Sequence, residues 1–160
     1  MRQITLLFLV FFCSIGICQS DNYQAMLKEL RAINSHYQDQ YNENSLIKSV
    51  MDKTMRYNLD PTLGKSEYAT KSERKGLKDF EGLQTARDNE TIAVYRKFQP
   101  PEYVAMMMNY NYMRKELRLR LTQGKITWRQ FSDDLEDLII RNRAKESDYR
   151  DKKEAQPVAS

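Results

Sequence analysis

Residues that carry most enzyme chemistry are scarce in this chain of 160 residues. It has two cysteines, one histidine (His36) and five glycines, and both cysteines, Cys13 and Cys18, lie near the N-terminus. The sequence contains neither a His-Glu-x-x-His motif nor a glycine-rich loop of the kind that cradles phosphates. We therefore expect no enzyme activity, no catalytic residues and no cofactor.

Long hydrophobic runs are also rare: the sequence has a single one, at the N-terminus. Arg2 supplies a positive end, residues 4–17 are mostly apolar, and residues 19–22 are polar. This three-part pattern is typical of a signal peptide. The apolar stretch of about 14 residues is short against the roughly 20 that a membrane-spanning helix needs. The pattern predicts a signal peptide over residues 1–18, a single helical domain over 19–155 and a disordered tail over 156–160.

Cleavage of the leader before Gln19 or before Asp21 would release a secreted or periplasmic protein. Two other outcomes are left open. In the first, the leader is not cleaved and keeps the chain at a membrane. Acylation of Cys18 would make a membrane-attached lipoprotein, although the branched Ile17 fits poorly where such motifs place a small residue. We expect membrane attachment in these two cases alone.

The mature body is expected to lack disulfides and a concentrated charge of one sign. Loss of Arg2 with the leader leaves 25 basic residues against 22 acidic ones, and the two signs are interspersed. Nucleic-acid binding needs a concentrated basic face, so we expect no nucleic-acid partner. With both cysteines in the leader, stability must come from packing, which a chain of about 140 residues can supply.

Alternation of period two is nearly absent, and apolar residues recur at helical spacing instead. The pattern predicts helices over residues 21–57, with an interruption near 42–45, and over 72–98, 101–123 and 128–150. Residues 58–75 read as a long connection that is mobile or functional. The fold class predicted is all-α, a small bundle of about four helices with a C-terminal antiparallel helical hairpin.

The hairpin has the clearest local signals. Gly124 can take a left-handed conformation after the first helix, and Thr127 with Gln130 forms a capping box for the second. Ile126 is expected to pack on Phe131. Residues equidistant from the turn should face each other, which predicts the pairs Leu121 with Phe131, Leu117 with Leu135, and Met113 with Ile139.

The second helix of this hairpin has few apolar side chains beyond the position opposite Tyr110. The apolar side chains at the start of the first helix must therefore be covered by some other element. Either the N-terminal helices cover it, or it is an exposed surface rich in methionine and tyrosine that binds a protein partner. The candidate partner-binding residues are Tyr103, Met106, Met107, Tyr110 and Tyr112.

Three other groups of residues could suggest a metal site or a membrane-binding surface, but each is better explained by ordinary packing or exposure to solvent. Met106, Met107 and Met108 point about 100° apart on a helix, which suits core packing better than a Cu(I) site. The acidic residues at 133–137 lack the turn of a calcium loop and read as a solvated face, so no metal is expected. The basic residues at 114–120 read as long side chains flanking a packed seam.

These observations favour an exported helical binding or assembly protein, with a protein partner expected and a homo-oligomer left open. One alternative is a small secreted inhibitor or effector that blocks a partner's site, favoured if residues 65–75 are ordered and exposed. The other is a carboxylate-dependent hydrolase, favoured if two buried acids face one cavity.

Overall fold

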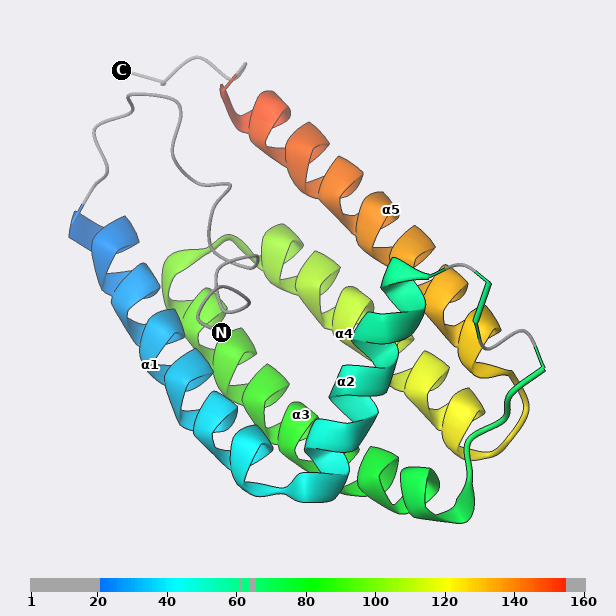
Figure 1. Cartoon of the computed structure of the whole chain (residues 1–160). Coiled ribbons are helices and arrows are strands. Elements are labelled where there is room, and N and C mark those ends of the chain that lie inside the picture. The colour runs from blue at the N-terminus through cyan, green and yellow to red at the C-terminus, as the bar shows by residue number, and fades with distance from the viewer. Residues whose placement is uncertain (1–20, 61, 64–65, 155–160) are drawn as a thin grey trace, which may run out of the picture.

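The computed structural model describes residues 21–60, 62–63 and 66–154 of the chain (Figure 1). The proposed signal peptide and the proposed C-terminal tail lie outside these residues. Within them the chain forms five helices, and their bounds are α1 (Asp21–Glu43), α2 (Ser45–Leu59), α3 (Lys71–Phe98), α4 (Pro101–Thr122) and α5 (Trp128–Glu154).

The all-α class and the small helical bundle are confirmed, with one more helix than the approximate four predicted. The extra helix comes from the break near residues 42–45. Asn44 is the N-cap of α2, and its side-chain oxygen accepts hydrogen bonds from the backbone N–H groups of Leu46 and Ile47 at 3.0 and 3.1 Å. No helix in the described part of the chain is long and apolar enough to cross a membrane.

The connection between α2 and α3 is shorter than the predicted 58–75. Helix α2 continues to Leu59 and α3 already begins at Lys71. The early start follows from a capping box: Glu73 N–H donates to Thr70 Oγ1 at 3.3 Å, and Thr70 N–H donates to Glu73 Oε2 at 2.7 Å. The helix predicted over residues 72–98 is thus confirmed with a start one residue earlier, whereas the connection predicted over 58–75 was too long at both ends.

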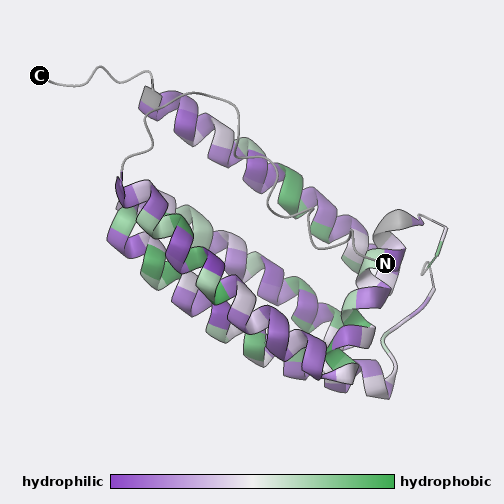
Figure 2. Ribbon diagram, turned by 60° about the vertical axis from the view of Figure 1, so that its left-hand side comes forward, coloured by the Kyte–Doolittle hydropathy of each residue, from purple (hydrophilic) through white to green (hydrophobic). Residues whose placement is uncertain are grey.

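Helix α3 is the centre of the bundle and packs against α1, α2 and α4. Helix α5 packs against α4 and α2, and the structure shows no packing of α5 against α1 or α3 in the residues it describes. Helices α1 and α5 accordingly form opposite edges of the molecule (Figures 1 and 2). One long side of α5 is therefore left without a neighbouring helix.

Two hydrophobic clusters form the core. The smaller one joins α1, α2 and α3 around Tyr37, Tyr41 and Ile47. The larger one joins α2, the connection, α3, α4 and α5 around Trp128, which is fully buried. The buried residues of the larger cluster are Val50, Tyr57, Ala69, Leu77, Leu117, Leu121, Ile126, Trp128, Phe131 and Leu138.

Several local predictions for residues 101–131 are confirmed. Pro101 begins α4, and Gly124 takes a left-handed φ of 68° after it. Thr127 N–H donates to Gln130 Oε1 at 2.9 Å, and Gln130 N–H donates to Thr127 Oγ1 at 3.2 Å, so the capping box of α5 is present. Ile126 and Phe131 belong to the same core cluster.

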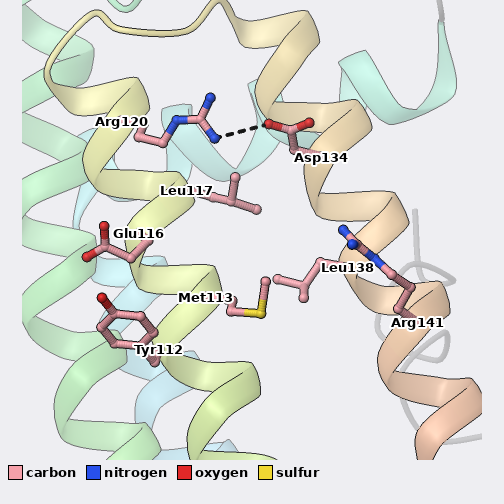
Figure 3. A pocket seen from close by; sticks show the side chains of 8 residues that line it. All are labelled: Tyr112, Met113, Glu116, Leu117, Arg120, Asp134, Leu138 and Arg141. Carbon is pink, nitrogen blue, oxygen red and sulfur yellow. Dashed lines mark hydrogen bonds and ion pairs between the residues drawn. The ribbon is translucent and has the colours of Figure 1, made fainter.

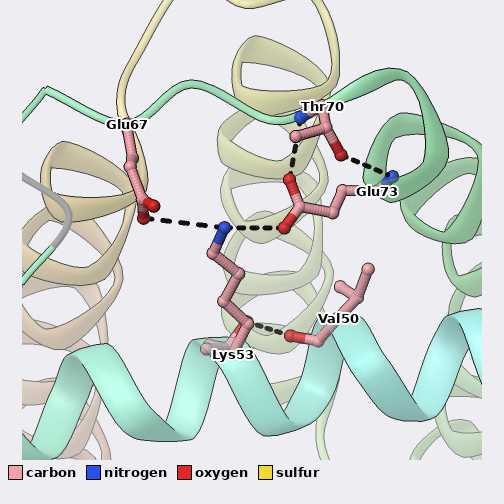
Figure 4. Close-up of polar contacts among 6 residues, drawn as sticks. Val50, Lys53, Glu67, Thr70 and Glu73 are labelled. Carbon is pink, nitrogen blue, oxygen red and sulfur yellow. Dashed lines mark hydrogen bonds and ion pairs between the residues drawn. The ribbon is translucent and has the colours of Figure 1, made fainter.

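Lys53 of α2 lies between Glu67 of the connection and Glu73 of α3 (Figure 4). Its ammonium lies 2.6 Å from Glu73 Oε1 and 3.6 Å from Glu67 Oε2, and it lies 5.2 Å from the centre of the Trp128 ring. The backbone N–H of Trp128 donates to the carbonyl of Glu67 at 2.8 Å. Two interactions therefore hold the connection near the start of α5: the ammonium of Lys53, which lies near both Glu67 and Trp128, and the backbone hydrogen bond from Trp128 to Glu67.

Helices α2 and α3 cross at Gly76, where a larger residue would not fit. A Cβ atom at Gly76 would lie 2.8 Å from the Leu46 carbonyl oxygen and 3.1 Å from a methyl of Val50. We expect Gly76→Ala to lower the free energy of unfolding by about 1–3 kcal/mol, because the two backbones would have to separate. Urea denaturation followed by circular dichroism measures this change.

Gly82 is the matched control on the same helix. It is exposed, and a Cβ there meets nothing within 4 Å. Gly82→Ala should raise the free energy of unfolding by roughly 0.5–1 kcal/mol through helix propensity alone. Equal effects of the two substitutions would contradict the close approach of α2 and α3.

Candidate functional site

A groove of about 350 Å³ lies between α4 and α5 (Figure 3). Met113 from α4 and Leu138 from α5 point toward each other across it. The groove is closed at the end near the α4–α5 connection by an ion pair between Arg120 Nη1 and Asp134 Oδ2, 3.5 Å apart. The residues that line it are Tyr112, Met113, Glu116, Leu117, Arg120, Asp134, Leu138 and Arg141.

A smaller cavity of about 50 Å³ continues the groove toward the start of α4. It shares Met113, Leu138 and Arg141 with the larger groove. The other residues that line it are Met106, Asn109, Tyr110, Asn142 and Lys145. The two spaces therefore form one elongated depression along the α4–α5 boundary.

The depression exists because α5 turns polar while α4 stays apolar. Beyond Leu138 the residues of α5 that line the smaller cavity are Arg141, Asn142 and Lys145. Long charged side chains keep their ends in water, so they do not fill the space beside the methionines and tyrosines of α4. The apolar floor is consequently left partly open.

The charge along the depression is uneven. At the end near the α4–α5 connection, Asp134 is paired with Arg120. Toward the other end, Arg141 Nε donates to the backbone carbonyl of Asp137 at 3.3 Å, and neither Arg141 nor Lys145 forms an ion pair among the described residues. An apolar ligand that also carries acidic groups would find cations at this end.

Three of the five predicted partner-binding residues line the depression. Tyr112 lines the larger groove and is 61% exposed, while Met106 and Tyr110 line the smaller cavity and are half-buried. Tyr110 also packs against the larger core cluster, and the guanidinium of Arg114 lies 5.3 Å from the centre of its ring. Met107 is half-buried and lines neither space.

Tyr103 lies in a different environment, a cluster of tyrosines at the far end of α4. Its ring centre is 5.3 Å from that of Tyr95 and 5.5 Å from that of Tyr149. Burial raises the pKa of the Tyr103 hydroxyl well above its usual range. The cover for Tyr103 thus comes from α3 and from the end of α5.

Glu146 is the acidic member of this region. Burial raises the pKa of its carboxyl above the ordinary value, and Asn142 Nδ2 donates to it at 2.6 Å. A glutamate with a raised pKa favours the folded state most at low pH, and this contribution is lost as the pH rises through its folded pKa. Glu146 therefore contributes less to the stability of the folded state when it is ionised.

Sequence reasoning named Tyr112 but missed Leu119, which lies on the same exposed face of α4. Met108, Tyr112 and Leu119 are 46, 61 and 43% exposed, and Met113 is 38% exposed. Spacings of four and seven place Met108, Tyr112 and Leu119 on one face of the helix. Residues 114–120 were interpreted as basic side chains flanking a packed seam, and that interpretation gave no sign that Leu119 is exposed.

No group of three or more histidine, cysteine, aspartate or glutamate side chains in the described ranges is arranged to hold a metal ion. The acids that line the groove are Glu116, which is half-buried, and Asp134, which is half-buried and paired with Arg120.

Comparison with known proteins gives no relative on which to base a function. No family model, no curated protein and no solved structure matches this chain. The surface of α4 and α5 must therefore be interpreted on its own chemistry.

Proposed function

We propose that this chain is an exported helical binding protein that takes an apolar segment of a partner protein into the depression between α4 and α5. One observation carries the proposal. Of the seven large hydrophobic side chains that are exposed among the described residues, four belong to α4: Tyr112 and Met113, which line the groove, and Met108 and Leu119, which share a face of the helix with Tyr112. Grouped exposed apolar side chains beside a groove are typical of a protein-binding surface.

The types of residue on this surface also favour a protein partner. Methionine adapts its shape to different neighbours, and tyrosine offers a large rigid ring with a polar end. The cations Arg141 and Lys145 beside the apolar floor favour a partner segment that carries acidic residues next to its apolar ones.

The proposal treats α4 and α5 as an antiparallel hairpin. The support comes from two contacts at opposite ends: Arg120 meets Asp134 near the connection, and Tyr103 meets Tyr149 far from it. An antiparallel pair fixes both walls of the groove through one short connection, so the groove can be present before the partner binds.

Export remains part of the proposal and is supported by the pattern of residues 1–18. Mass measurement of the mature N-terminus of the protein recovered from its native source checks it. A start at Gln19 or Asp21 supports a cleaved leader, a lipid-modified Cys18 supports membrane attachment, and an intact Met1 in the cytosol contradicts export.

Binding at the groove is tested by removing its exposed apolar side chains. Tyr112→Ser combined with Met113→Asn should leave the fold intact, because both side chains are more than one-third exposed. We expect the amount of partner that co-purifies after cross-linking to fall at least about tenfold, as hot-spot residues would require. Mass spectrometry of the cross-linked partner measures it.

Met55→Asn is the control. This side chain is 44% exposed and lies outside the groove. Unchanged capture with the control and loss with the groove variant supports the proposal. Equal capture by both variants would show that the α4 surface does not bind the partner.

The inhibitor hypothesis keeps a specific observation in its favour. Tyr68 is 56% exposed, and the neighbouring Glu67 accepts the hydrogen bond from Trp128 N–H that holds the connection in place. A held segment with an exposed ring suits insertion into a partner's site. Selective loss of binding in Tyr68→Ser, with the Tyr112 and Met113 variant unaffected, would favour this function over the groove.

A further inference from the structure

The outer face of α5 has a single large apolar side chain at its centre. Ile140 is 57% exposed and lies at the middle of this 27-residue helix. Since α5 packs on α4 and α2 alone among the described elements, no helix covers this face. Ala144, one turn further on, is also exposed and small enough to allow another helix to approach closely.

Charges on either side of Ile140 have opposite sign. Exposed acids precede it, at Asp133, Glu136 and Asp137, and exposed cations follow it, at Arg141 and Arg143. Asp133 is paired with Arg129, but the side chains of Glu136, Asp137, Arg141 and Arg143 form no ion pair with one another or with other residues that the structure describes. These four charges are available to a second molecule.

We infer that this face binds a second copy of the same chain, with the two α5 helices antiparallel about a two-fold axis at Ile140. Such an axis places Glu136 opposite Arg143 of the second copy, because the two positions are almost equally distant from Ile140. It likewise places Asp137 near Arg141 of the second copy. Self-complementarity of this kind is what a two-fold interface between identical chains requires.

The rotation of the helix supports this pairing. At about 100° per residue, Glu136 and Arg143 lie on one flank of Ile140, and Asp137 and Arg141 lie on the other flank. When two identical helices pack antiparallel about a two-fold axis, each flank of one helix faces the same flank of the other. A parallel arrangement would instead bring opposite flanks together, with Glu136 near Asp137 and Arg143 near Arg141 of the second copy, where like charges repel.

The dimer is weak, because each copy contributes one large apolar side chain and exposed ion pairs add little. We expect a dissociation constant on the order of 10 µM, increasing with salt concentration. The α4 side of each groove and Lys145 stay uncovered in this arrangement, so Lys145 would meet the partner's acidic residues while Arg141 pairs with Asp137 of the second copy. The dimer would therefore present two partner-binding grooves at once, which strengthens binding to a partner that has two sites.

Charge reversal tests the interface in solution. Sedimentation velocity is measured over a range of concentrations on the protein as recovered after export. Glu136→Arg and Arg143→Glu should each weaken the dimer about tenfold, since symmetry turns two ion pairs into repulsive pairs. The double variant Glu136→Arg/Arg143→Glu should restore dimer formation, and circular dichroism checks that all three remain folded.

Cross-linking tests the position of the axis. Ile140→Cys should form a disulfide-linked dimer under mild oxidation, because the two side chains meet at the axis, whereas Ala105→Cys on α4, also exposed, should not. A monomer at ~100 µM, about ten times the expected dissociation constant, would overturn the inference. So would a dimer that neither charge variant weakens or that the double variant fails to restore. The Tyr112 and Met113 variant should leave the dimer unchanged, so failure of the groove proposal and failure of this inference are distinguishable.

Discussion

Replacing Glu81 with leucine is expected to lower the free energy of unfolding by about 3 kcal/mol, because the change leaves a charged guanidinium buried without its partner. Arg118 is 5% exposed, and its Nε donates to Glu81 Oε2 at 2.5 Å. Its Nη2 is buried and has no hydrogen-bond partner. Burial also lowers the pKa of the guanidinium, because removal from water disfavours the charged form. Urea denaturation at pH 7 measures the effect.

The double variant Glu81→Leu/Arg118→Met separates the cost of a stranded charge from the value of the pair. Methionine fills much of the same space beside Phe80, whose ring centre is 5.7 Å from the guanidinium carbon. We expect the double variant to lie within about 1 kcal/mol of the wild type or to be more stable, as found for buried ion pairs replaced by apolar residues. A double variant as unstable as Glu81→Leu would show that the ion pair itself stabilises the fold.

Trp128→Ala should have the largest effect of any single substitution considered, a loss of about 4 kcal/mol in the free energy of unfolding. Trp128 is fully buried and its ring contacts those of Tyr57 and Phe131, with centres 5.9 and 6.1 Å apart. Alanine would leave a cavity where α2, α4, α5 and the connection meet. Thermal and urea denaturation both measure the loss.

Trp128→Phe should cost much less than Trp128→Ala. The indole Nε1 is buried and has no acceptor, so the tryptophan already bears the cost of an unsatisfied N–H, which phenylalanine removes. Tyr112→Ala serves as the surface reference and should change stability by no more than about 0.5 kcal/mol. Equal losses for the phenylalanine and alanine variants would contradict the role of the ring in filling this junction.

The features of the fold that depend on residues close together in the sequence could be predicted. Helical spacing indicated most of the helices, and Pro101, Gly124 and the Thr127–Gln130 capping box marked their ends correctly. These signals act within one helical turn, so no tertiary structure is needed to read them.

The position of Arg118 could not be predicted in this way. Its segment was read as basic side chains flanking a packed seam, but Arg118 lies inside the core, against Phe80 and Glu81 of α3. The reading was wrong for this residue because its partner is 37 positions away in the chain. Composition and spacing within α4 carry no information about that partner.

The sequence predicted residues on the α4 wall of the groove but not those on the α5 wall. The run of methionine and tyrosine on α4 correctly drew attention to Met106, Tyr110 and Tyr112, which line the depression. The opposite wall depends on how α5 is rotated against α4. Met113 was predicted to face Ile139, whereas Leu138 stands across the groove from it (Figure 3). A shift of one residue rotates a helix by about 100°, which decides the side chains that line a groove.

The hydrogen bond from Trp128 N–H to the Glu67 carbonyl also has a consequence for the order of folding. The first amides of a helix normally find a cap within a few residues, and this one closes a loop that includes all of α3 and α4. Closing so long a loop costs chain entropy that local helix formation does not. The start of α5 should therefore be completed late, after the helices between have reached their places, and this junction would limit how quickly the native topology is reached.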